Sequence, residues 1–125
     1  MEKKNLDWEN IGFAYHQTDK RYVSNFKDGQ WDEGTLTSDP NVVLNECAGI
    51  LHYCQECFEG LKAYTTEDGS IVTFRPDQNA ERMMNSAKGL EMPPFPKERF
   101  LDAVDQVVRV NEAWVPPYGS GATLY

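Results

Sequence analysis

The chain has 125 residues, of which 40% are hydrophobic and 26% are charged, and this composition is typical of a folded domain rather than a disordered segment. Its 20 acidic residues outnumber the 12 Lys and Arg residues, which gives a formal net charge of −8. Because a nucleic-acid ligand requires a basic surface, this balance argues against binding to DNA or RNA.

The predicted location is the cytoplasm. The first residues, MEKKNLDWENIGF, are charged and lack the apolar core of a signal peptide. No stretch approaches the roughly 18 apolar residues that a membrane-spanning helix needs, so no membrane partner is expected. Cys47, Cys54 and Cys57 are an odd number in a chain without an export signal, which favours reduced thiols over a disulfide framework.

Short strands are predicted in the first half of the chain. The strand-like runs are RYVSNF (21–26), WDEGTLT (31–37), NVVLNE (41–46), GLKAYT (60–65) and SIVTFR (70–75). Two of the connections, at Asp28 and Gly29 and at Asp68 and Gly69, end in an Asp-Gly pair, which is a hairpin signal before a new run. This half therefore predicts an antiparallel sheet.

Two helices are predicted to follow. Apolar residues recur at helical spacing after Pro76, at Ala80, Met83, Met84, Ala87 and Leu90. Gly89 and the pair Pro93 and Pro94 mark the end of this helix. A second helix over residues 97–114 has an apolar face made of Phe100, Leu101, Val104, Val107 and Val108. The expected fold is α+β, an antiparallel sheet with two helices packed on one face.

The segment LHYCQECFEGLKAY (51–64) combines residue types that suit several kinds of site. His52, Cys54 and Cys57 offer metal ligands, but a structural zinc site needs four ligands and no second CxxC lies nearby, so no metal site is predicted. A thioredoxin-like CxxC opens a helix in a βαβ unit, whereas the surroundings here are antiparallel. The two cysteines therefore stay without an assigned role beyond packing as small apolar residues.

Aromatic residues and a glycine in the same segment leave two interpretations open. Tyr53 and Phe58 either pack in the core or line a pocket. Gly60 interrupts a strand-like run, which marks either a bend or a place where a ligand approaches the backbone. Composition and spacing do not decide between these interpretations.

Three motifs resemble one family of enzymes. LHYCQECFEGLKAY, FRPDQNAERMMNSA (74–87) and WVPPYGSGATLY (114–125), in this order and spacing, are similar to the branched-chain amino acid aminotransferases, which are fold-type IV pyridoxal-phosphate enzymes. The FEG segment alone is shared by D-amino acid transaminases and aminodeoxychorismate lyases. The resemblance implies an enzyme of branched-chain amino acid biosynthesis that transfers an amino group between Leu, Ile or Val and 2-oxoglutarate.

The resemblance also implies roles for individual residues. Arg82 matches the arginine that contacts the phosphate of pyridoxal 5′-phosphate, and it lies opposite the apolar stripe at about 100° per residue. A solvated surface arginine fits the same geometry, but planar bidentate donors suit phosphate. The expected substrate-binding residues are Phe13, Tyr53, Phe58, Gly60 and Tyr125, with Tyr53 contributed across a homodimer interface in relatives.

The reactive part of the site is expected elsewhere. Transamination needs a Schiff-base lysine, and the resemblance places it in a larger C-terminal domain that is expected to be absent, so that residues 1–125 form only the small N-terminal domain. Lys62 occupies a basic position of the family that is not the cofactor lysine. The chain alone is therefore expected to be inactive, with no catalytic residue of its own. Two alternatives remain open, another fold-type IV enzyme and a stand-alone domain that binds a ligand or partner without catalysis.

Overall fold

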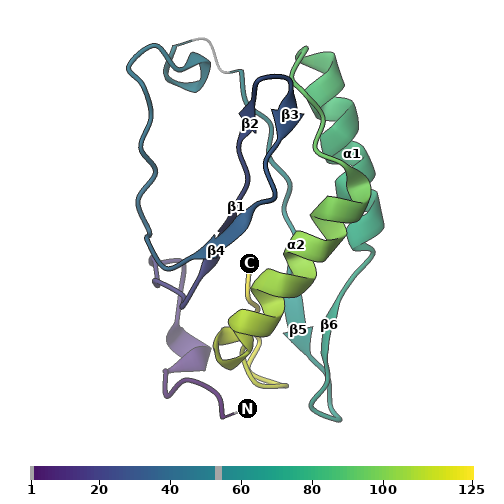
Figure 1. Cartoon of the computed structure of the whole chain (residues 1–125). Helices are drawn as coiled ribbons and strands as arrows, with labels where there is room; N and C mark the ends of the chain where they lie inside the picture. The colour runs from purple at the N-terminus through teal and green to yellow at the C-terminus, as the bar shows by residue number, and fades with distance from the viewer. Residues whose placement is uncertain (1, 53–54) are drawn as a thin grey trace.

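The computed structural model describes residues 2–52 and 55–125, and it has the predicted α+β class (Figure 1). The strands are β1 (Arg21–Val23), β2 (Phe26–Lys27), β3 (Gln30–Trp31), β4 (Thr35–Thr37), β5 (Ala63–Thr65) and β6 (Ile71–Thr73). The helices are α1 (Pro76–Gly89) and α2 (Lys97–Val110), with short 3-10 turns η1 (Trp8–Asn10), η2 (Gly49–Leu51) and η3 (Glu112–Trp114). Within the described residues, no helix is long and apolar enough to cross a membrane.

The strands pair as three antiparallel two-stranded ladders in the described part of the chain. β1 pairs with β4, and β2 with β3, so that these four strands form one long hairpin with its tip beside α1 in Figure 1. Asp28 and Gly29 form the tip with φ angles of 53° and 84°, positive as a type I′ turn requires. β5 pairs with β6 across the second predicted Asp-Gly turn, so both hairpin predictions are confirmed.

The strand predicted over residues 41–46 is wrong. This segment forms no ladder and runs away from the sheets as a long excursion between β4 and β5 (Figure 1). Its apolar side chains Val42, Val43 and Leu44 are exposed. The sequence has strand propensity here, but β4 already pairs with β1, and among the described strands none pairs with residues 41–46. Strand propensity alone does not form a strand without a neighbour to pair with.

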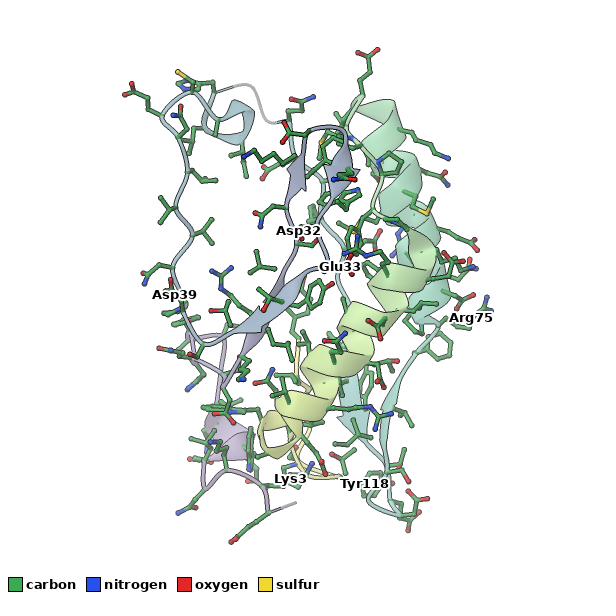
Figure 2. The ribbon with its side chains drawn as sticks, viewed as in Figure 1. Lys3, Asp32, Glu33, Asp39, Arg75 and Tyr118 are labelled. Atoms are coloured by element: carbon green, nitrogen blue, oxygen red, sulfur yellow. The ribbon has the colours of Figure 1, made fainter. Side chains whose placement is uncertain are left out.

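The first helix begins at Pro76, as the proline signal predicts. Arg75 precedes it in the left-handed region with φ of 46°, and its guanidinium donates to both carboxylate oxygens of Asp77 at 2.8 and 2.9 Å. Figure 2 shows Arg75 at the outer edge of the molecule. The helix ends at Gly89, and Met92 N–H then donates to the Ala87 carbonyl at 2.8 Å, which closes its last turn.

The second helix is shorter than predicted. It ends at Val110 rather than at residue 114, and η3 follows Asn111. The side chain of Asn111 is buried, and its amide donates to the carbonyls of Lys20 at 2.7 Å and Val107 at 2.9 Å. Lys20 N–H donates back to Asn111 Oδ1 at 3.0 Å. Asparagine has both donor and acceptor groups, so it ties the helix end to the chain before β1 and breaks the helical period there.

The helices pack against each other, and α2 also packs against β1 (Figure 1). An aromatic cluster joins the long hairpin to the connection between the helices, because Trp31 makes edge contacts with Phe26 and Phe95 and donates its indole N–H to the Pro94 carbonyl at 3.1 Å. Among the described residues, the buried apolar side chains are small: Ala63, Ala80, Ala87, Ala113 and Val115. The centre of the molecule is therefore thinly filled.

Candidate functional site

An ion pair joins α1 to the segment before β5. Arg82 Nε donates to Glu59 Oε1 at 2.7 Å and Arg82 Nη2 donates to Glu59 Oε2 at 2.6 Å, which is the bidentate arrangement. The Glu59 side chain is only 7% exposed, whereas the Arg82 side chain is 62% exposed. The acid of this pair is thus enclosed by the protein, and the base faces solvent.

Asn79 connects the same segment to α1 a second time. Its buried amide donates to Glu59 Oε2 at 2.9 Å and to the Gly60 carbonyl at 2.8 Å. Asn79 and Arg82 are three residues apart, so they lie on neighbouring positions of the helix surface. One helix therefore holds both the carboxylate of Glu59 and the backbone of Gly60.

The charges of this cluster are fixed at neutral pH. Hydrogen bonds from Arg82, and to a smaller extent from Asn79, hold the pKa of Glu59 below its usual value of 4.5, although burial acts in the opposite direction. The same hydrogen bond and the charge of Glu59 raise the pKa of Arg82. Glu59 is therefore an anion that accepts hydrogen bonds, and Arg82 is a cation that donates them.

Part of the Arg82 guanidinium remains available. A guanidinium carries five N–H groups, and Glu59 takes two of those on Arg82. Within the described residues, no hydrogen bond is assigned to the other three. An anion that approaches from solvent can therefore be bound by donors that point away from Glu59.

Tyr125 reaches this cluster through a backbone bridge. Ala63 N–H donates to the Leu124 carbonyl at 2.8 Å, and Leu124 N–H donates back to Ala63 at 3.2 Å. The ring of Tyr125 consequently lies over Gly60, where a Cβ would be 3.2 Å from the Tyr125 hydroxyl oxygen and 3.3 Å from Cε2. The absence of a side chain at Gly60 thus permits this close approach by the Tyr125 ring. The approaching group is a side chain of the chain itself, so the predicted bend or ligand approach at Gly60 stays a prediction.

The other residues expected at the site have different positions. Phe58 is next to Glu59 in sequence and is 85% exposed, which argues against a core role and leaves it available as a pocket wall. Phe13 is also exposed, in the loop after η1, and the described residues show no ring contact or hydrogen bond between it and the Glu59–Arg82 pair. Tyr53 and Cys54 lie outside the described residues.

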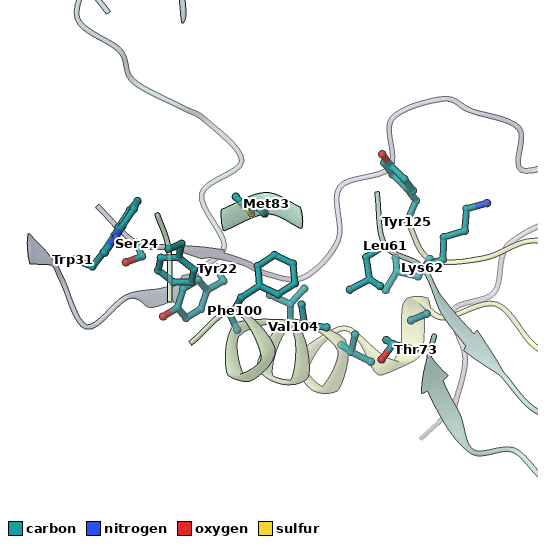
Figure 3. Close-up of a pocket in the computed structure, with 16 residues that line it drawn as sticks. Tyr22, Ser24, Trp31, Leu61, Lys62, Thr73, Met83, Phe100, Val104 and Tyr125 are labelled. Carbon is teal, nitrogen blue, oxygen red and sulfur yellow. The ribbon is translucent and has the colours of Figure 1, made fainter. Parts of the chain in front are cut away.

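A cavity of about 450 Å³ lies between α2 and the strands, next to the cluster (Figure 3). Figure 3 shows Leu61, Lys62 and Tyr125 gathered at one end, and Tyr22 and Trp31 at the other. Phe100 and Val104 line its helical side. No group of His, Cys, Asp and Glu side chains that could hold a metal ion is found in residues 2–52 and 55–125.

Glu59 and Asn79 were missed by the sequence analysis, although both stand in the quoted motifs. Asn79 had a detectable signal, because it is a polar residue adjacent to Ala80 on a helix face that also carries Met83 and Ala87. A polar side chain at such a position is expected to have a hydrogen-bond partner. Nothing in the local pattern identifies Glu59 as that partner, because the two are 20 residues apart.

Comparison with known proteins shows which sequences this chain resembles. A scan against protein-family models gave no match. Individual sequences do match, and they are aminotransferases over nearly the whole chain.

More particularly, several of these relatives are branched-chain-amino-acid aminotransferases. One from Haemophilus influenzae is 55% identical and one from Helicobacter pylori is 46% identical, each over 98% of this chain and 36% of the relative. Another from Arabidopsis thaliana is 46% identical over 97% of this chain and 34% of the relative. The chain thus spans about a third of the length of these relatives, and over that part it is similar to the N-terminal part of a branched-chain-amino-acid aminotransferase.

Proposed function

We propose that this chain supplies part of the cofactor and substrate site of a pyridoxal-phosphate aminotransferase that acts on Leu, Ile and Val with 2-oxoglutarate as the acceptor. The observation that carries the proposal is the exposed Arg82 guanidinium, which Glu59 holds by two N–H groups, while the described residues accept no hydrogen bond from the other three. The similarity to branched-chain aminotransferases supports the substrate class.

Arg82 is the proposed ligand of the cofactor phosphate. Its planar donors fit phosphate oxygens, and its exposure lets an anion reach them. When bound, pyridoxal phosphate supplies an electron sink for removal of the substrate α-proton. The Schiff-base lysine is proposed to lie in the part of the relatives that this chain does not match, so that the chain alone is inactive, and Lys62 is given no covalent role.

Phe58, Gly60 and Tyr125 are the proposed walls around the substrate side chain, together with Tyr53 and, more distantly, Phe13. Burial of an aliphatic side chain against aromatic rings is worth ~1.5–3 kcal/mol. Such walls distinguish one aliphatic side chain from another by only ~1–3 kcal/mol per methylene. One relative, 43% identical, is a methionine aminotransferase of Arabidopsis thaliana. This agrees with a site that recognises the apolar character of the substrate side chain more than its shape.

The proposed setting is a cytoplasmic homodimer of the fold-type IV group. In it, residues 1–125 form the small domain, a larger second domain carries the lysine, and Tyr53 extends toward the site of the neighbouring subunit. The excursion between β4 and β5, which carries exposed Val42, Val43 and Leu44, is a suitable surface for contact between the subunits.

A titration with pyridoxal 5′-phosphate tests the assignment of Arg82. We expect the chain to bind the cofactor reversibly, with no borohydride-reduced adduct at a single lysine in the mass spectrum. Arg82→Gln should weaken binding about tenfold or more, because charge-assisted hydrogen bonds contribute ~1.5–3 kcal/mol.

The matched control is Arg109→Gln, which removes another exposed, ion-paired arginine from the second helix. It should leave the affinity unchanged. An equal loss in both variants, or a stoichiometric lysine adduct on the chain, would contradict the proposal.

A further inference from the structure

The Glu59 carboxylate makes more contacts than a simple counter-ion needs. It accepts hydrogen bonds from Arg82 Nε, Arg82 Nη2 and Asn79 Nδ2, at 2.7, 2.6 and 2.9 Å. An arginine side chain has several rotatable bonds, and without a fixed partner the side chain adopts many rotamers. Two parallel hydrogen bonds to one carboxylate fix both the position and the plane of the guanidinium.

The burial of the two partners is unequal, and this inequality indicates which one sets the geometry. Glu59 is 7% exposed and Arg82 is 62% exposed. In the pair between Arg109 and Asp105, by contrast, the side chains are 77% and 56% exposed, so neither partner is held by its surroundings. The enclosed Glu59 is therefore the fixed partner, and it orients a cation that remains open to solvent.

Asn79 fixes the acid in turn. Both amide hydrogens of Asn79 are used, one on Glu59 Oε2 and one on the Gly60 carbonyl. Because Asn79 and Arg82 belong to the same helix, the acid is tied to the element that also carries the base. The position of the guanidinium relative to Gly60 is thereby determined before any ligand binds.

We propose that Glu59 and Asn79 are positioning residues that hold the Arg82 guanidinium so that its three remaining N–H groups form a prearranged binding site for a phosphate group. This inference rests on the function proposed above. The Arg82 side chain loses its conformational entropy during folding, so phosphate binds a guanidinium that is already in place.

A competing role for Glu59 predicts the opposite effect on binding. If Glu59 only neutralises Arg82, its negative charge repels an incoming phosphate, and removal of that charge strengthens phosphate binding. If Glu59 positions Arg82, the same substitution releases the guanidinium and weakens phosphate binding. The sign of the change therefore separates the two roles.

The first measurement needs no ligand. In the ¹⁵N-labelled chain, the Nε–H signal of Arg82, assigned by its loss in Arg82→Lys, should exchange slowly with water. Glu59→Gln and Asn79→Ala should each accelerate that exchange, Glu59→Gln by about tenfold or more. The control Asp105→Asn, which removes a carboxylate from the exposed Arg109 pair, should leave the Arg82 signal unchanged.

The second measurement uses inorganic phosphate as the probe, followed by the shift of the same signal. Glu59→Gln should lower the phosphate affinity about tenfold, and Asp105→Asn should not. Glu59→Asp keeps the charge but shortens the side chain by one methylene, so it should give faster exchange and a smaller loss of affinity. This variant decides the matter if Glu59→Gln does not fold by circular dichroism.

The results distinguish this inference from the proposed function. Unchanged exchange in Glu59→Gln, or tighter phosphate binding, overturns the positioning role even if the wild-type chain binds pyridoxal phosphate through Arg82. If the wild-type chain binds neither phosphate nor pyridoxal phosphate, the proposed function and the phosphate site both fail. In that case the exchange data still show whether Glu59 and Asn79 order the Arg82 side chain.

Discussion

Among the individual residues, Glu59 links the stability of the fold to the charge of the candidate site. The Arg82 hydrogen bonds, helped by Asn79, keep its pKa below 4.5 in the folded chain, and these partners are lost on unfolding. A carboxylate whose pKa is depressed by folding contributes stability above its unfolded pKa, and this contribution disappears as the pH falls through the folded pKa. The carboxylate of Glu59 therefore stabilises the fold at neutral pH and loses this effect in acid.

The corresponding prediction compares wild type with Glu59→Gln in urea unfolding at several pH values. At pH 7 the variant should have a lower unfolding midpoint, because the hydrogen bonds from Arg82 to the carboxylate are weakened. The difference should shrink as the pH falls below about 4.5. A gap of constant size down to pH 3 would contradict the role assigned to this carboxylate.

The sequence is informative about single residues where a local rule applies. Arg82 is expected to project away from the apolar stripe of its helix, and its guanidinium is exposed. Gly60 is expected to mark either a bend or the approach of a ligand to the backbone, and the group that lies against it is the Tyr125 ring, which the sequence pattern does not predict. The partner of Arg82 is not foreseeable, because Glu59 lies 23 residues away and only the path of the chain between them brings the two together.

At the scale of secondary structure, turn chemistry predicts more than strand propensity does. The Asp-Gly pair at 28 and 29 predicts the correct hairpin, because positive φ at both positions is nearly specific to that turn. The β-branched run at 42 and 43 predicts a false strand, since a strand also needs a neighbour to pair with. Helix starts are likewise local, whereas the end of α2 depends on the contact between Asn111 and the distant Lys20.

Gly34 provides a test of how the long hairpin is packed. It lies between β3 and β4 with φ of +74°, and a Cβ there would be 1.9 Å from the Tyr22 hydroxyl oxygen. Gly34→Ala should therefore lower the free energy of unfolding by roughly 2–3 kcal/mol, through backbone strain and displacement of the Tyr22 ring.

Gly29→Ala is the matched control for this substitution. Gly29 also has positive φ, +84°, but no described atom beyond Gly29 and its two chain neighbours lies within 4 Å of the position that a Cβ would occupy there. It should cost only about 1 kcal/mol, the strain of the left-handed conformation alone. The free energy of unfolding is measured in urea. An equal decrease in the two variants would show that the Tyr22 ring moves aside without destabilising the fold.

For the molecule as a whole, the main feature is the contrast between small buried side chains and large exposed ones. In the described part of the chain, the buried apolar residues are alanines and one valine, whereas aromatic side chains such as Phe58, Phe74 and Tyr125 are exposed. Periodicity in the sequence predicts the α+β class and the faces of the helices. It does not predict the space left between α2 and the strands, because that space depends on how the layers meet in three dimensions.

This space yields the last prediction. The cavity of about 450 Å³ is bordered by apolar side chains, and Ala103 on α2 faces it. Ala103→Leu adds three carbon atoms there, and each buried methylene contributes ~0.8 kcal/mol before the loss of rotamer freedom is subtracted. We therefore expect a gain of about 1–2 kcal/mol in the free energy of unfolding, together with weaker fluorescence of a bound hydrophobic dye.

The control is Asp102→Leu, which places a leucine at the exposed neighbouring position of α2. It should change the free energy of unfolding by no more than about 0.5 kcal/mol. If Ala103→Leu destabilises the fold instead, α2 and the strands pack tightly in solution and leave no such cavity, because overpacking a filled core is destabilising.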